Sequence, residues 1–287
     1  FASLDFRFRR QQRARHLPAC HCGACQLQVR HRASKHSIGI GLHVLNHKLR
    51  GLQKRSTGCI QAGSNSFRVG PSRIDWTGTS LRITVNEWGA LPMVSPLRGE
   101  IVLTPVSLPD AVYDLTPDGA HRWRPIAPMA HVSVDLTQGH KWEGHGYFDS
   151  NTGIRPLEQD FKFWTWGRFP QRDRTVCFYD AIRRDGSHLH LGAAFDRQGG
   201  AQVIEPPPLT RMARSRWAVR RESRADAGTV PKERLSLLDA PFYSRALVET
   251  PIYGETSLGI HEALDLDRFR LPILKPMLAV RVPRRKG

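Results

Sequence analysis

The sequence predicts an all-β protein built from antiparallel sheets. From Ser66 onward, short segments alternate apolar and polar residues, as strands with one buried face do. Turn signals separate these segments at close intervals, and we find no long amphipathic helix. Short strands joined by frequent turns are typical of a β-sandwich or a β-barrel.

The first expected strands lie between Ser80 and Leu136. The segment SLRITVNEW alternates Leu81, Ile83 and Val85 with polar residues, which predicts a half-buried strand. The segments GEIVLTPV and HVSVDL have the same pattern. We therefore expect three strands of one sheet here.

The remaining strands follow in order after residue 160. The segment TVCFYDAIRRDGSHLHLGAAF contains two strands around Asp185-Gly186, a strong hairpin signal. Gly199-Gly200 predicts another turn, and the run Pro206–Pro208 ends the strand that follows. The segments RSRWAVRRES and RALVETPIYGE are expected to be strands, and GIHEALDLDRFR a last strand with a short tail.

The length of 287 residues suits one large domain or two ordinary ones. No apolar run reaches 18 residues, and we see no secretory signal, so we expect neither a spanning helix nor export. The composition changes between about Asp149 and Pro170, where we place a boundary between two β units.

The net charge of +17 is concentrated in the first 65 residues. Up to Asn65 there are 12 Lys and Arg against one acid, Asp5, and the next acid is Asp75. Four of the five cysteines also lie there. The segment has no convincing helical or strand period, so we expect it to be atypical and disordered.

Three interpretations of this basic segment stay open. It could be a tail for nucleic acid or anionic lipid. It could hold zinc through ACHCGAC, although Cys22 and Cys25 form a single CxxC and Cys59 stands alone. It could also be a shifted reading frame, which we favour. A nucleic-acid binder would rest on this segment alone, so we expect no nucleic-acid partner.

Aromatic residues crowd the middle of the chain, and they suit a large apolar cavity as well as an ordinary core. We single out Trp142, Trp164 and Trp166 as candidates for binding an apolar ligand. In FKFWTWGRF, Trp164 and Trp166 share one face of a strand with Lys162 and Arg168.

Two short motifs place polar groups among these aromatics. AHRWRPIAP holds His121 and Trp123 two residues apart, and GYFDSN holds Tyr147 and Asp149 two apart, so each pair shares a face if extended. His121 could equally be a structural histidine, and Asp149 could belong to an ordinary turn in DSNTG.

Other motifs offer less. There is no GxSxG, P-loop, GxGxxG or HExxH pattern. His188 and His190 share a strand face without an evident third ligand, so we expect no metal site. Cys177 alternates with apolar residues and is expected to be buried.

Five segments together resemble one family. They are FRVGPSRIDWTGTSLRITVNE, HRWRPIAPMAHVSVDL, WEGHGYFDSNTGIRPLEQDFKFWTWGR, DAPFYSRA and GIHEALDLDRF, in that order. They look like the carotenoid 1,2-hydratases, or hydroxyneurosporene synthases, of purple phototrophic bacteria. The resemblance covers about residues 66–287.

The resemblance implies two consecutive lipocalin-like antiparallel β-barrels. We assign residues 66–160 to the remainder of the first and residues 161–287 to the second. Residues 1–65 have the length that the family uses for its first strands but not the expected residues. A frameshift upstream of about Asn65 would explain this, and it would leave the first barrel incomplete.

The resemblance implies a cofactor-independent hydro-lyase that adds water to the C1–C2 double bond of acyclic carotenoids such as neurosporene or lycopene. The family's functional residues correspond to His121, Trp123, Tyr147 and Asp149. Asp149 is then the proton donor, because burial keeps a carboxyl protonated. Trp123 and Tyr147 stabilise the cation, and His121 deprotonates the water. The alternative is a non-catalytic carrier, or a pericyclase for a terpenoid or polyketide, on the same fold.

The expected substrate is insoluble in water, so we expect it to be collected from a membrane. Peripheral attachment on the cytoplasmic side is the arrangement we predict, with the basic end RVPRRKG in contact with anionic lipid.

Overall fold

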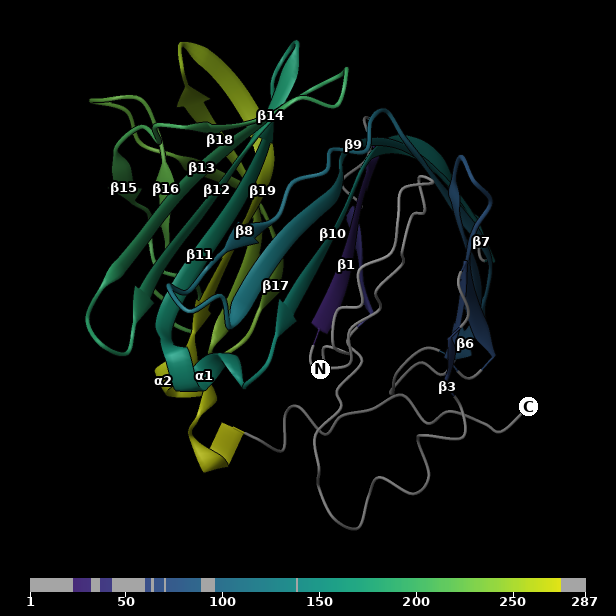
Figure 1. Cartoon of the computed structure of the whole chain (residues 1–287), viewed down its shortest axis with the longest axis horizontal. Helices are drawn as coiled ribbons and strands as arrows, with labels where there is room; N and C mark the ends of the chain where they lie inside the picture. The colour runs from purple at the N-terminus through teal and green to yellow at the C-terminus, as the bar shows by residue number, and fades with distance from the viewer. Residues whose placement is uncertain are drawn as a thin grey trace.

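A computed structural model describes residues 23–31, 37–42, 60–62, 65–69, 71–88, 96–137 and 139–274. Figure 1 shows two large twisted sheets beside each other, with short helices at one end of the second. Every strand pair in the described residues is antiparallel. The predicted all-β antiparallel class is confirmed.

The first sheet has ten strands, and its main path runs β2-β1-β10-β9-β7-β6-β5-β4-β3. Strand β8 pairs with β9 beside this path. The strands are β1 (Gly23–His31), β2 (Ser37–Leu42), β3 (Ile60–Ala62), β4 (Ser66–Val69), β5 (Ser72–Trp76), β6 (Leu81–Trp88), β7 (Pro96–Pro105), β8 (Tyr113–Asp114), β9 (His121–Leu136) and β10 (His140–Gly153).

The second sheet has seven strands in the order β14-β13-β12-β11-β19-β18-β17, and β15 and β16 form a small third sheet. These strands are β11 (Phe161–Pro170), β12 (Arg174–Arg183), β13 (His188–Asp196), β14 (Ala201–Ile204), β15 (Leu209–Arg211), β16 (Glu222–Arg224), β17 (Lys232–Asp239), β18 (Tyr243–Ile252) and β19 (Glu255–Asp265). The helices are α1 (Leu157–Asp160), α2 (Leu266–Phe269) and the 3-10 helix η3 (Pro272–Leu274).

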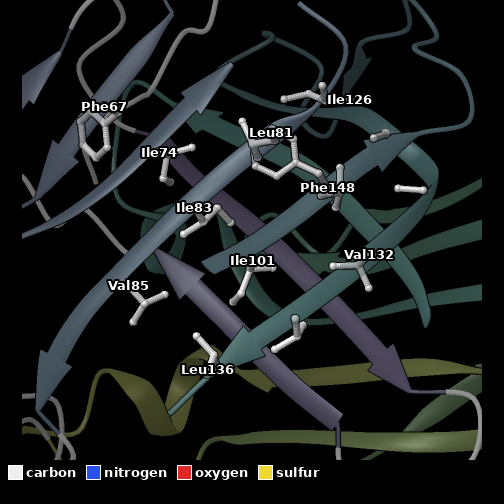
Figure 2. Packing of buried hydrophobic residues seen from close by; sticks show 14 residues of the cluster. Phe67, Ile74, Leu81, Ile83, Val85, Ile101, Ile126, Val132, Leu136 and Phe148 are labelled. Atoms are coloured by element: carbon white, nitrogen blue, oxygen red, sulfur yellow. The ribbon is translucent and has the colours of Figure 1, made fainter. Parts of the chain in front are cut away.

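The first sheet curves around its own apolar core, shown in Figure 2. Leu81, Ile83 and Val85 of β6 are buried in it, as the alternating pattern predicts. Phe148 of β10 closes the same core from the opposite part of the sheet. The pairing path of each large sheet is open among the described residues, with no printed pairing between its end strands.

Two expectations about strands are wrong. The basic segment contains β1, β2 and β3, and β1 pairs with β10 along its whole length. Backbone pairing to an available strand edge does not require a side-chain period, which explains the miss. The frame of this segment stays a prediction, and its CxxC side chains lie outside the described residues.

The segment RSRWAVRRES is mostly irregular with a turn at Arg216 and Trp217, and strand β16 takes in only its last two residues. Ala218 adopts a φ of 57°, and its backbone N–H donates to the Ser215 carbonyl. This left-handed residue breaks the extended chain that the alternation of Trp217 and Val219 suggested.

The second sheet buries both of its faces. One face packs around Phe169, Phe178 and Val248. The other carries Trp166 and Tyr179 and packs against residues of the first sheet. The first sheet ends at Gly153 and the second begins at Phe161, while the division of domains at residue 160 stays a prediction.

Candidate active site

Three buried side chains of the first sheet form a closed hydrogen-bonded cluster, which we call the acid cluster: Trp123 on β9, and Tyr147 and Asp149 on β10. Tyr147 Oη donates to Asp149 Oδ2 at 2.9 Å, and Trp123 Nε1 lies 2.9 Å from the same oxygen. Trp123 Nε1 also lies 3.2 Å from Tyr147 Oη. The two sequence motifs are therefore brought together, although they lie 24 or more residues apart.

An irregular stretch of strand pairing places this cluster. The register between β9 and β10 shifts on both sides of Phe148, where β9 contributes Pro125 and Pro128. Proline has no backbone N–H for the ladder, so such residues are expected at irregular positions. Phe148 points into the core of the first sheet, while Tyr147 and Asp149 belong to the opposite face.

The second sheet covers that opposite face with aromatic rings. Tyr147 packs against Trp166 of β11 with ring centroids 5.1 Å apart. Trp123 lies 6.2 Å from the ring of Tyr179 and 6.3 Å from that of Phe195. The acid cluster therefore lies at the interface of two sheets and is enclosed by both.

A buried cation fastens the interface next to the acid cluster. Arg168 of β11 donates to the carbonyl of Pro128 at 3.1 Å and to that of Gly146 at 3.2 Å. Its guanidinium lies 5.2 Å from the centroid of the Tyr147 ring, within the range of a cation–π contact. Arg168 thus fixes the second sheet to the irregular stretch that carries Tyr147.

Burial makes Asp149 a weak acid. Its exposed fraction is 2%, and desolvation raises the pKa of its carboxyl from the ordinary 3.8 to about 7. The hydrogen bonds from Tyr147 and Trp123 favour the carboxylate and limit this rise. Oδ1 accepts no hydrogen bond from any described residue, so this oxygen can carry the proton. At neutral pH a large fraction of Asp149 is a neutral proton donor.

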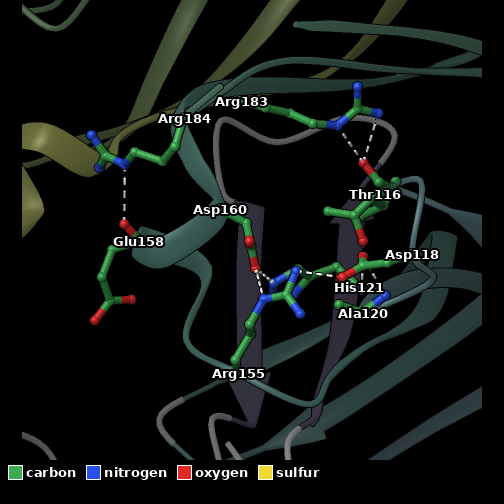
Figure 3. Close-up of polar contacts among 10 residues, drawn as sticks. Thr116, Asp118, Ala120, His121, Arg155, Glu158, Asp160, Arg183 and Arg184 are labelled. Atoms are coloured by element: carbon green, nitrogen blue, oxygen red, sulfur yellow. Dashed lines mark hydrogen bonds and ion pairs between the residues drawn. The ribbon is translucent and has the colours of Figure 1, made fainter. Parts of the chain in front are cut away.

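His121 belongs to a separate polar network, shown in Figure 3. Its Nε2 lies 2.7 Å from Asp160 Oδ2, and Asp160 accepts from Arg155 at 2.6 Å. Arg155 also pairs with Asp118 at 2.6 Å. Desolvation lowers the pKa of His121, although Asp160 opposes this effect.

The ring of His121 is directed away from the acid. A Cβ atom built on Gly153 would lie 2.6 Å from Nδ1, so this nitrogen lies against the end of β10, and Nε2 is taken by Asp160. In the strand register His121 pairs with Gly153, four residues beyond Asp149. The structure therefore places His121 on the strand of Trp123 but in different contacts from Asp149.

The three tryptophans proposed to bind an apolar ligand lie in two different places. Trp166 is buried against Tyr147, and Trp164 packs at the edge of the same cluster, 5.7 Å from the Tyr179 ring. Trp142 instead packs against the core inside the first sheet. Even-numbered residues of β10 face that core, which accounts for its position.

Sequence reasoning missed several members of the interface, among them Tyr179, Phe195 and Glu262. Each of these residues lies in a segment that was predicted to be a strand. The sequence of a single strand does not show which of its two faces packs against the other sheet. Arg168 was noted on the face of Trp166, and a cation between the aromatic residues Trp166 and Phe169 was the available signal. Cys177, expected to be buried, is a free thiol with no exposed surface.

The described residues contain no group of three or more potential metal ligands. What they do contain is a carboxyl whose pKa burial raises to about 7, held by two donors and walled by aromatic rings. On a pair of antiparallel sheets, this arrangement has the features that general-acid catalysis in an apolar setting requires.

The chain belongs to the carotenoid hydratase CrtC family, whose model matches residues 30–287. It is 57% identical over 233 residues to the acyclic carotenoid 1,2-hydratase of Cereibacter sphaeroides, covering 81% of this chain and 84% of that protein. It is also 57% identical over 234 residues to the enzyme of the same name from Rhodobacter capsulatus, covering 81% and 83%.

Among solved structures, the chain is similar to a putative AttH from Nitrosomonas europaea. The TM-score is 0.50 with 14% identity, covering 76% of this chain and 74% of that one. This likeness concerns the fold alone. The predicted family is confirmed by the family model and the two relatives.

Proposed function

We propose that this protein hydrates the terminal C1–C2 double bond of an acyclic carotenoid, such as neurosporene or lycopene, to a tertiary alcohol. The observation that carries the proposal is the neutral, buried carboxyl of Asp149 among aromatic rings. An isolated alkene is a weak base, so it is protonated only by an acid whose proton is not lost to water. The relatives named above act on acyclic carotenoids, which supports this substrate class.

In the proposed reaction Asp149 delivers its proton to C2. The positive charge develops at C1, which carries two methyl groups and the rest of the chain. We assign the stabilisation of that charge to the aromatic rings of Tyr147 and Trp166, whose centroids lie 5.1 Å apart. As Asp149 becomes a carboxylate, the bonds from Tyr147 and Trp123 stabilise it. A water oxygen then bonds to C1, and the proton that it releases restores the neutral acid of Asp149, so the sum is alkene plus water to alcohol.

The contacts of His121 favour a positioning role over the base that removes the water proton. Its Nε2 is taken by Asp160, and its Nδ1 lies against the backbone of Gly153 rather than towards Asp149. The ring anchors the start of β9, two residues before Trp123. We therefore propose that His121 holds Trp123 in place for its bond to Asp149.

The test uses Asp149→Asn in water labelled with oxygen-18. The wild-type protein should form a labelled tertiary alcohol from a carotenoid with a free end, whereas the variant should bind the carotenoid without turnover. Asp135→Asn is the matched control, because Asp135 lies on β9 with an exposed side chain. Wild-type rates in the Asp149 variant would contradict the acid assignment. Recovery of unlabelled or cyclised product from the wild type would favour the carrier or pericyclase.

We also propose that the protein meets a membrane through the loop between β7 and β8. Val106, Leu108 and Val112 of this loop are each at least 43% exposed. Ala111 of the same loop packs against the interface that holds the acid cluster. Tyr113, the first residue of β8, stacks on Trp123 with ring centroids 5.3 Å apart. The exposed apolar side chains of this loop, which flank the exposed Asp110, would let a polyene pass from lipid towards the acid.

No helix of the described residues is long and apolar enough to cross a bilayer. The basic C-terminal segment lies outside the described residues. We therefore test the loop with Leu108→Glu, and with Val230→Glu as a control of similar exposure on another loop. Flotation with vesicles of mixed neutral and anionic lipids should fall in the first variant only. Equal flotation of both would contradict the loop as the contact.

A further inference from the structure

The second sheet carries a buried ion pair on the face that covers the acid cluster. Arg245 of β18 donates to Glu262 of β19, with Nε and Nη2 at 2.8 Å and 2.6 Å from Oε1. Their side chains are 12% and 4% exposed. Two charges are rarely withdrawn from water in this way unless they are paired, and such a pair is weak evidence for stability in itself.

The strand registers place this pair next to Asp149. Glu262 is the partner of Trp166 in the pairing of β19 with β11, so their side chains share a face. Trp166 packs on the ring of Tyr147, and Tyr147 donates to Asp149. This aromatic contact links the ion pair on one sheet to the acid on the other.

The two members of the ion pair change the pKa of Asp149 in opposite directions. The negative charge of Glu262 raises the pKa of Asp149, and the positive charge of Arg245 lowers it. The effect of Glu262 is the larger of the two. Field effects of this kind persist inside a protein because water does not screen them.

Other titratable or charged groups lie around the carboxyl of Asp149. They are Tyr147 on β10, Arg168 on β11, Cys177 and Tyr179 on β12, and Tyr243 on β18. Burial raises the pKa values of the phenols and the thiol, so these groups stay neutral. The charges near Asp149 are therefore Arg168, Arg245 and Glu262.

We propose that the Arg245–Glu262 ion pair is a positioning element that keeps the proton on Asp149 from across the sheet interface, its two members acting in opposite directions. The inference rests on the proposed hydration, in which Asp149 must be protonated at the working pH. The carboxylate of Glu262 favours the neutral acid, and Arg245 holds that carboxylate in place through its Nε and Nη2. The first sheet supplies the proton and the second sets how firmly it is held.

The experiment compares pH profiles of kcat/KM for Glu262→Gln and Arg245→Met with the wild type. Activity should fall as pH rises through the pKa of Asp149. Glu262→Gln should move this midpoint down by about one pH unit, and Arg245→Met should move it up, as expected for one nearby charge. Midpoints that stay fixed, or that move in the same direction, would overturn the proposal.

Glu222→Gln is the matched control, since Glu222 is buried and paired with Arg220 at 2.7 Å but belongs to β16. This variant should keep the wild-type midpoint. Glu262→Asp keeps the charge and should do the same. If Glu262→Gln does not fold by circular dichroism, Arg245→Met and Glu262→Asp decide the question by their midpoints.

A readout without substrate separates this inference from the proposed reaction. Infrared difference spectra, with Asp149→Asn as the blank, follow the protonated carboxyl of Asp149 through the pH range. The midpoint shifts of opposite sign should appear there even if no carotenoid is hydrated. Shifted spectra without turnover would contradict the proposed function alone, whereas turnover with unshifted spectra would overturn the ion-pair inference alone.

Discussion

The Asp149→Asn substitution should change stability in a way that depends on pH. The pKa of the folded carboxyl is raised from 3.8 to about 7. Below about pH 4 the carboxyl is neutral in both states and contributes no difference. As pH rises towards 7 the unfolded chain ionises first. A shift of about three units at about 1.4 kcal/mol each therefore lowers the free energy of unfolding by about 4 kcal/mol.

Asparagine cannot ionise, so the variant lacks this loss. The unfolding free energy of Asp149→Asn minus that of the wild type should rise by about 4 kcal/mol between about pH 4 and pH 8. Urea unfolding at several pH values measures the difference, and the contributions of distant groups cancel in it. Asp135→Asn on the exposed face of β9 should give no such rise. A difference that is constant with pH would refute the assignment of a neutral buried Asp149.

Three further predictions concern the same interface. Tyr147→Phe removes a donor that favours the carboxylate, so the pKa of Asp149 should rise and the alkaline limit of kcat/KM should move to higher pH. An unchanged pH profile would contradict this prediction. Gly153→Ala places a Cβ 2.6 Å from His121 Nδ1 and should lower the unfolding free energy by about 1–3 kcal/mol in urea titrations, which a wild-type value would contradict. Cys177 is buried and burial raises the pKa of its thiol, so a thiol reagent should modify it only in denaturant, and rapid native labelling would count against its position.

The sequence was a good guide to the strands whose two faces meet different surroundings. Leu81, Ile83 and Val85 alternate because one face of β6 meets the core and the other meets water. The pattern is lost from Gly146 to Ser150, where every residue is buried because both faces of β10 are covered. At Ala218 the backbone conformation overrode an alternation that looked convincing.

The sequence predicted only those features of the site that depend on the spacing of residues within one strand. Two-residue steps placed Trp123 with His121, and Tyr147 with Asp149, on common faces. Spacing could not tell that Trp123 would bond Asp149 while His121 bonded Asp160, because strand register decides both contacts. The contributions of Glu262 and Arg245 depend on a sheet-to-sheet contact, and no periodicity along one strand records it.

The location of Asp149 between two sheets links acid strength to assembly of the whole fold. In a chain whose second sheet has not yet docked, the carboxyl would meet water and ionise at neutral pH like any surface aspartate. Such an intermediate has no proton to give. Under the proposed reaction, reactivity towards alkenes therefore requires the docked second sheet, and a chain without it is inactive rather than unselective.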